Sequence, residues 1–201
     1  MIRVLLAEDQ AMVRGALAAL LTLEPEIDIV AEVARGDEIL RAAQQTLPDV
    51  ALIDIEMPGD DGLTATAALH RALPDCKILI LTTFGRPGYL RRAMEGGAVG
   101  FLVKDAPAAQ LAADIRRVMA GERVIDPALA SAALSEGNNP LTDREREVLA
   151  RARTGATIAE IADELVLSEG TVRNYLSVAI GKLNAHNRVE AARIAEAKGW
   201  L

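Results

Sequence analysis

The sequence predicts a doubly wound α/β domain with a parallel sheet, followed by a smaller all-α domain. Two observations predict this arrangement. Over residues 1–121, five short apolar runs rich in Val, Ile and Leu alternate with longer segments of helical spacing, which is typical of a sheet with helices on both faces. Beyond residue 139 the short runs stop and only helical spacing remains.

The five apolar runs are the predicted strands. Each is nearly continuous, as expected for strands that are buried on both faces. They are Ile2–Ala7, Ile27–Val33, Val50–Asp54, Ile78–Thr82 and Val99–Val103. The order expected for a flavodoxin-like winding is 2-1-3-4-5.

The segments between the strands are predicted helices, and one face of each is apolar. In the first segment this face holds Val13, Leu17, Leu20 and Leu21, and in the last it holds Leu111, Ile115 and Val118. After Gly121 the pattern changes to a short helical stretch near Pro127 and then to the turn-rich residues 136–140. We therefore expect one domain over residues 1–121, a linker with a short helix over 122–139, and a second domain over 140–201.

Four helix starts are visible in the second domain. Two match the capping box, in which a Thr is followed three residues later by a Glu, and two others offer a good N-cap residue. The pairs are Thr142 with Glu145 and Thr157 with Glu160, and the single caps are Ser168 and Asn187.

Composition excludes several classes of protein. With 51% hydrophobic residues the chain is not disordered, and no apolar run is long enough to span a bilayer. A single cysteine, Cys76, excludes an internal disulfide, and two histidines argue against a Cys/His zinc site. The acidic start MIRVLLAEDQ does not look like a signal peptide. We expect a cytoplasmic protein without a membrane partner.

Taken over the whole chain, the net charge of −7 argues against a nucleic-acid partner, but the charge is unevenly distributed. Residues 1–138 hold 13 Lys and Arg against 20 Asp and Glu, whereas residues 139–201 hold nine of each. The acidic excess therefore belongs to the first domain, and the two domains are expected to have different partners.

Charged and hydroxyl side chains follow the predicted strands of the first domain. Glu8 and Asp9 follow the first strand, Asp54 ends the third, Thr82 ends the fourth and Lys104 follows the fifth. Ligands bind at this edge of an open parallel sheet. Converging carboxylates would repel one another unless a cation joined them, and such an oxygen-rich set suits Mg²⁺.

The chemistry favoured by this set is phosphoryl transfer to a carboxylate. Asp54 is the best nucleophile because it ends the central strand, and the turn Met57-Pro58-Gly59 follows it. Lys104 and the Thr82 hydroxyl can bind phosphoryl oxygens. The alternative is that the acids are ordinary loop residues or helix caps, which for Asp9 taken alone is an even choice.

These residues resemble the receiver domains of bacterial two-component response regulators. The matching elements are Glu8-Asp9, the segment from Asp54 to Gly59, Thr82 and Lys104, with Phe101 at the place of the family's switch aromatic. The resemblance covers residues 1–121. It implies that a sensor histidine kinase phosphorylates Asp54, and that Mg²⁺ is held by Glu8, Asp9, Asp54 and the backbone carbonyl of Glu56. It also implies that Thr82 and Phe101 relay the conformational change that follows phosphorylation.

The second domain contains a predicted helix-turn-helix. Two helices are joined by the short turn Leu165-Val166-Leu167, and the second of them would enter the major groove. On its exposed side, Arg173 and Asn174 can read guanine and adenine, and Thr171 and Lys182 suit phosphates. The predicted DNA-binding residues are Thr171, Arg173, Asn174, Ser177 and Lys182. A generic four-helix interaction domain is the alternative from pattern alone.

The segments Leu141–Leu149, Ser168–Arg173 and Asn187–Ala191 are similar to the LuxR-type DNA-binding domain. With the receiver in front, the chain resembles the NarL/FixJ class of response regulators. The stretches Ala7–Gln10, Thr82–Tyr89 and Gly170–Tyr175 are also similar to the membrane-lipid desaturase regulators of bacillus-type thermosensing systems. Ala159, Tyr175 and Ser177 depart from the LuxR-type pattern by removing charge, so we expect modest DNA affinity for a monomer.

We therefore expect a transcription regulator and not an enzyme, beyond slow loss of its own phosphoryl group. The expected partners are a sensor histidine kinase, double-stranded DNA and, after phosphorylation, a second copy of the chain, with RNA polymerase as a further candidate. The receiver would dimerise through its first and fifth helices or through the region of the fourth, and the sequence does not choose between them.

Two other functions stay open at this point. The first is a Mg²⁺-dependent phosphohydrolase, because Glu56 stands two residues after Asp54, where such an enzyme has its general acid. The second is a regulator that acts without phosphate, for which substitution of Asp54 would leave dimerisation and DNA binding unchanged.

Overall fold

The computed structural model of the chain describes residues 1–83, 87–104, 108–135 and 139–201. The described residues form two compact units, which we treat one at a time. The first contains residues 1–83, 90–104 and 108–131, and the second contains residues 87–89, 132–135 and 139–201. Residues 136–138 of the predicted linker lie outside the described residues.

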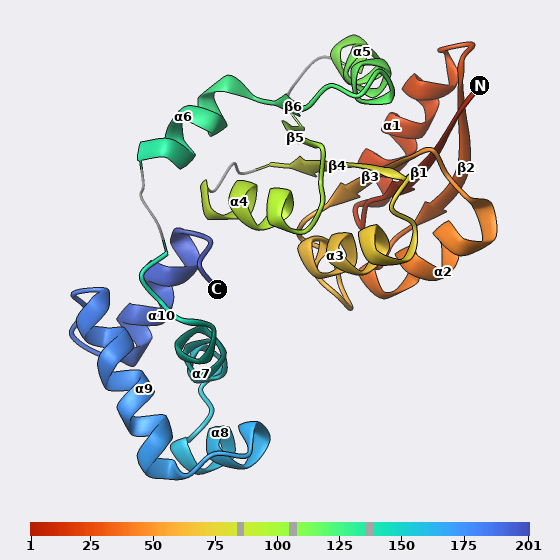
Figure 1. The fold of residues 1–201 in the computed structure, drawn as a ribbon. Helices are drawn as coiled ribbons and strands as arrows, with labels where there is room; N and C mark the ends of the chain where they lie inside the picture. Colours follow the sequence, from red (N-terminus) through yellow and green to blue (C-terminus); the bar gives the residue numbers. More distant parts are fainter. Residues whose placement is uncertain (84–86, 105–107, 136–138) are drawn as a thin grey trace. The chain divides into compact units, whose positions relative to one another are not determined.

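The first unit is built on a parallel sheet (Figure 1). Its strands are β1 (Ile2–Ala7), β2 (Ile27–Val33), β3 (Val50–Asp54), β4 (Lys77–Thr82), β5 (Gly100–Val103) and β6 (Val124–Ile125). Their order is β2-β1-β3-β4-β5-β6, and each neighbouring pair is parallel. The predicted order is thus confirmed, with one strand added at the edge beyond β5. That strand was missed because two residues are too few to show a hydrophobic period.

Helices cover both faces of this sheet (Figure 1). The helices of the first part of the chain are α1 (Ala11–Thr22), α2 (Gly36–Thr46), α3 (Gly62–Ala72), α4 (Pro87–Glu95) and α5 (Ala108–Met119), followed by α6 (Pro127–Ser135). Helices α1 and α5 lie against one face, and α2 and α3 lie against the other (Figure 1). The short helix expected near Pro127 is α6.

The core lies on both sides of the sheet because successive strand residues point to opposite faces. Val4 and Leu6 of β1 join the same buried cluster as Leu111 and Ile115 of α5. Leu5, between them, is also fully buried. The near-continuous apolar runs in the sequence follow from this arrangement.

The sheet reverses its winding beside β1, which lies between β2 and β3. The chain therefore leaves the carboxyl ends of β1 and β3 in opposite directions, and this is the place where open parallel sheets bind their ligands. Glu8 and Asp54 stand at these two strand ends.

The second unit contains four helices after α6 in its described residues, α7 (Asp143–Arg153), α8 (Ile158–Leu165), α9 (Glu169–Lys182) and α10 (Arg188–Ala197). The four predicted starts are confirmed: Thr142 and Thr157 form complete capping boxes, and Ser168 and Asn187 cap α9 and α10 with their side chains. All four helices contribute to one buried cluster of this unit.

Within the described ranges, no helix has both the length and the apolar character that a membrane crossing requires.

Candidate functional sites

Three carboxylates meet at the carboxyl edge of the sheet. Glu8 follows β1 and is fully buried, and Asp54 ends β3 and is 4% exposed. Asp9, the next residue after Glu8, is exposed. One oxygen from each of the three lies within 4.8 Å of the others. The backbone amide of Gln10 donates to Oε1 of Glu8, at 3.3 Å, which helps to fix that carboxylate.

Lys104 brings the counter-charge to this cluster. Its Nζ lies 2.6 Å from Oε2 of Glu8 and 2.8 Å from Oδ2 of Asp54. Burial raises the pKa of Glu8, and the nearby Asp54 adds to the rise while Lys104 opposes it. Burial alone would lower the pKa of Lys104, but the two carboxylates outweigh it and raise that pKa. The ammonium group therefore stays charged between the two acids.

The cluster is suited to a divalent cation. Three carboxylates against one ammonium leave a formal excess of two negative charges in a largely buried site, which is costly without a further cation. Carboxylate oxygens are the donors that Mg²⁺ prefers. Glu56, whose backbone carbonyl is the remaining predicted ligand, lies two residues beyond Asp54 with its side chain exposed.

Thr82 lies on β4, the strand next to the β3 strand of Asp54, and Phe101 lies on β5, one strand further along the sheet. Thr82 ends β4 and is 3% exposed, and its carbonyl accepts the backbone amide of Lys104 at 2.8 Å. Phe101 lies on β5 opposite Ile80 and is fully buried. Asp54, Thr82 and Phe101 thus lie on three successive strands of the sheet. The relay from Asp54 through Thr82 and Phe101 stays a prediction.

Two glycines fix the backbone around Asp54. Gly59 has φ +83° in the turn after β3, a conformation that glycine adopts without strain. At Gly62, the first residue of α3, a Cβ atom would lie 1.9 Å from the carbonyl oxygen of Asp54. Helix α3 therefore rests directly on the backbone of the candidate phosphoacceptor.

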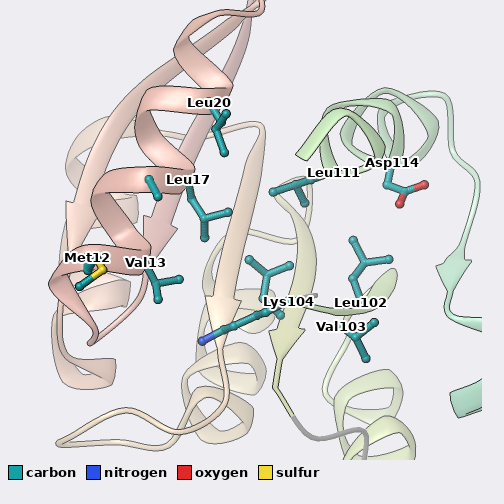
Figure 2. Close-up of a pocket in the computed structure, with 11 residues that line it drawn as sticks. Met12, Val13, Leu17, Leu20, Leu102, Val103, Lys104, Leu111 and Asp114 are labelled. Atoms are coloured by element: carbon teal, nitrogen blue, oxygen red, sulfur yellow. The ribbon is translucent and has the colours of Figure 1, made fainter. Parts of the chain in front are cut away.

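An apolar cavity of about 330 Å³ lies between α1 and α5. Figure 2 shows side chains of α1, among them Val13 and Leu17, facing Leu111 of α5 across it, with Lys104 also in its wall. The rim includes Met12 and Leu20, two of the exposed large apolar residues of the molecule. The apolar faces of both helices were predicted from the sequence, but the cavity was not, because it depends on how the two helices pack.

The second unit has a helix-turn-helix formed by α8 and α9. The turn contains Val166, which has φ 54° and a side chain that is 90% exposed. A β-branched residue is strained in this left-handed conformation. Ser168 then caps α9 by accepting the backbone amide of Thr171 at 3.1 Å.

The predicted DNA-binding residues are on α9. Arg173, Asn174 and Ser177 are exposed, and Thr171 is half-buried. Val172 and Leu176 of the same helix are buried in the core cluster, so α9 presents a polar side to solvent. These positions fit the predicted readout of DNA, which stays a prediction.

Two basic side chains of α9 are paired with acids. Arg173 donates to Glu169, one turn earlier, at 2.6 Å, and both side chains are at least half exposed. Lys182 instead reaches Glu145 of α7, 37 residues away, and contacts both of its carboxylate oxygens. The first pair has a visible signal in the sequence, the i,i+4 spacing of an acid before a base; the second has none.

Comparisons with known proteins agree with this two-part organisation. The model of the response regulator receiver domain matches residues 4–116, and the model of the bacterial regulatory proteins of the luxR family matches residues 139–195.

Known relatives match over the whole chain. Two transcriptional regulatory proteins of Bacillus subtilis (strain 168), YvfU and DesR, are 48% and 46% identical to it, and each match covers 100% of both chains. A solved structure of two RcsB dimers bound to two parallel DNAs has a TM-score of 0.67 and 22% identity, covering 98% of each chain. At that identity the RcsB likeness supports the fold.

Proposed function

The chain belongs to the two-component response regulators that join a receiver domain to a LuxR-type DNA-binding domain and regulate transcription, and we propose that phosphorylation of Asp54 by a sensor histidine kinase controls its binding to DNA. The observation that carries this proposal is the buried Asp54 carboxylate, 2.8 Å from the Lys104 ammonium and within 4.8 Å of two further carboxylates.

The proposed reaction is transfer of a phosphoryl group from a kinase histidine to Asp54. A carboxylate oxygen of Asp54 forms the new bond to phosphorus, and the bond from phosphorus to the histidine nitrogen breaks, with its electron pair returning to the imidazole. Lys104 binds an incoming phosphoryl oxygen and the Thr82 hydroxyl donates to another. Mg²⁺ held by Glu8, Asp9 and Asp54, together with the Glu56 carbonyl, would offset charge on the phosphoryl oxygens.

The product would change the receiver because a buried carboxylate becomes a dianion with three strong acceptor oxygens. Thr82 would turn toward these oxygens and Phe101 would respond to the vacated space. The consequence we propose is a homodimer that places two α9 helices on DNA half-sites about one helical turn apart, or a near multiple. A protein of similar fold, RcsB, binds DNA as dimers, which supports a dimeric DNA-bound form.

The face formed by α1 and α5 is the dimer surface we favour over the region of α4. It carries the apolar cavity, and Met12 on its rim is 87% exposed. Met12→Asp should abolish the phosphate-dependent dimer in sedimentation experiments. Leu47→Asp is the matched control, because Leu47 is 63% exposed and is not part of that cavity's lining. Loss of the dimer in the control alone would contradict this choice of face.

The central experiment is a gel shift with the DNA upstream of the protein's own gene. The full chain is treated with acetyl phosphate and Mg²⁺ or left untreated, and oligomeric state is measured in parallel. Phosphate should raise both dimer fraction and DNA affinity in the wild type and in Asp75→Asn, an exposed control, but not in Asp54→Ala. DNA affinity and dimer fraction that do not respond to phosphate would support the regulator that acts without it.

The same preparation tests the enzyme alternative. A regulator should take up one phosphoryl group per chain and release it slowly. Repeated turnover of a phosphomonoester would instead favour the phosphohydrolase.

Binding to chromosomal DNA would place the protein in the cytoplasm. RNA polymerase would be a further partner of the DNA-bound form, and a reconstituted transcription assay would test that contact.

A further inference from the structure

The C-terminal end of α9 is tied to the start of α7 by one side chain. Lys182 donates to Oε1 and Oε2 of Glu145, at 2.9 and 2.7 Å. Oε2 of the same carboxylate accepts the backbone amide of Thr142 at 2.7 Å, which is half of the α7 capping box. The carboxylate thus has donors on two helix ends, and its side chain is 7% exposed.

The direction of Lys182 separates it from the polar side of α9. It follows Arg173 by nine residues, and at about 100° per residue the two side chains leave the helix on opposite sides. The N-terminal turns of a recognition helix are the part that reaches base edges, and Lys182 is in the last turn of α9. Arg173 therefore has the geometry of a reading residue and Lys182 does not.

Pairing with a phosphate would require Lys182 to leave Glu145. The Glu145 carboxylate would then remain in a site where it is 7% exposed, without its counter-charge, and an uncompensated buried charge is strongly unfavourable. A phosphate contact at the edge of DNA is solvated and screened by salt, so it would contribute less free energy than the lost ion pair. The ion pair should therefore persist when the protein binds DNA.

We propose that Lys182 is a positioning residue: through Glu145 it fixes the angle at which α9 is presented to the major groove, and it does not contact DNA. The core residues Leu176 and Leu183 pack this end of α9 into the unit, and the ion pair adds a directional contact between the last turn of α9 and the start of α7. The proposal rests on the DNA-binding function of the second unit.

One substitution changes DNA affinity in opposite directions for the two roles. Glu145→Gln keeps a side chain that can complete the α7 capping box but removes the charge. If Lys182 positions α9, this substitution lowers DNA affinity, about tenfold if one base contact is misplaced. If Lys182 instead binds phosphate, the same substitution frees it and raises DNA affinity.

Lys182→Met keeps the apolar stem and removes the ammonium. The positioning role predicts the same loss as for Glu145→Gln, no further loss in the double variant, and recovery in Lys182→Arg. It also predicts that the slope of log Kd against log salt concentration is the same for Lys182→Met as for the wild type. If Lys182 bound a phosphate, its loss in Lys182→Met would instead reduce that slope by about 0.9.

The probe is a duplex selected from a randomised library by the wild-type full chain, so failure of DNA binding itself is seen before any variant is compared. Glu147→Gln on α7 and Arg193→Met on α10 remove one negative and one positive charge elsewhere in the unit and should keep wild-type affinity. Fluorescence of Trp200, the single tryptophan of the chain, reports whether each variant is folded. Higher affinity in Glu145→Gln, or additive losses in the double variant, would overturn the proposal.

Discussion

The ammonium group of Lys104 lies 2.8 Å from Oδ2 of Asp54, so the candidate phosphoacceptor is paired with a positive charge before any phosphoryl group arrives. The same ammonium lies 2.6 Å from Glu8. One cation thus holds together two buried carboxylates from neighbouring strands, and it is already where a phosphoryl oxygen would need it.

Lys104→Gln should therefore slow phosphorylation and destabilise the receiver. Removing the ammonium leaves two buried carboxylates unpaired, which costs about 3 kcal/mol by comparison with other broken buried ion pairs. Labelling by acetyl phosphate should slow by tenfold or more, because the charge that stabilises the phosphoryl oxygens is lost. Lys77→Gln is the control, because Lys77 begins β4 and so lies at the opposite end of the strands. Wild-type labelling by Lys104→Gln would show that the ammonium has no role in transfer.

Mg²⁺ should stabilise the receiver, and removal of the ion with EDTA should reverse the effect. Binding to the folded state alone adds about 2.7 kcal/mol when the ion is at one hundred times its Kd. Asp9→Asn removes one of the three clustered carboxylates and should weaken this response, whereas Asp75→Asn should not. The measurement is a thermal melt of the receiver at increasing Mg²⁺. A shift of equal size in both variants would contradict a site at Asp9.

Gly62→Ala should disturb Asp54 without touching its side chain. The new Cβ would lie 1.9 Å from the Asp54 carbonyl oxygen, so α3 must move away from β3, at a cost of roughly 2 kcal/mol. Gly15→Ala is the matched control, because nothing lies within 4 Å of its Cβ position and alanine favours the helix by about 1 kcal/mol. Calorimetry should show a lower melting temperature for Gly62→Ala and a higher one for Gly15→Ala. Phosphorylation should be slower in Gly62→Ala alone.

That Glu8, Asp54 and Lys104 lie together could be predicted from the sequence, because parallel strands end at a common edge. Glu8, Asp54 and Lys104 each follow an apolar run, and that placement is sufficient to bring them together. The helix starts were equally visible, since a capping box is local in sequence. By contrast, the pair of Lys182 with Glu145 joins residues 37 positions apart, and no periodicity or motif specifies it. Contacts that depend on tertiary packing were the ones missed.

Glu169→Gln should relax the sequence preference of α9. A carboxylate in the first turn of a recognition helix repels phosphates and can accept only from cytosine or adenine amino groups. It also holds Arg173 at 2.6 Å, and this exposed pair adds little to stability. We expect tighter binding to random duplex and at least fivefold weaker discrimination between selected and mismatched DNA. Glu147→Gln serves as the control, and unchanged base preference in Glu169→Gln would exclude a reading role.

The stability of the second unit should depend on pH through Glu145. Burial alone would raise the pKa of this carboxyl, but Lys182 and the Thr142 amide outweigh it, so the folded-state pKa lies below the ordinary value of 4.5. The charged form is therefore favoured by folding, and its contribution is complete above pH 4.5 and declines as pH falls toward the folded-state pKa.

This dependence is measured as the free energy of unfolding from pH 7 downward. It is followed by the fluorescence of Trp200, which is partly buried and packs against the core cluster of the second unit. The stability advantage of the wild type over Glu145→Gln should be constant near neutral pH and shrink below about pH 4.5 as the carboxylate gains a proton. An advantage that instead grew on acidification would mean that folding favours the protonated acid. If Glu147→Gln reduced the pH dependence of the unfolding free energy as much as Glu145→Gln does, the ion pair with Lys182 would not be the cause of that dependence.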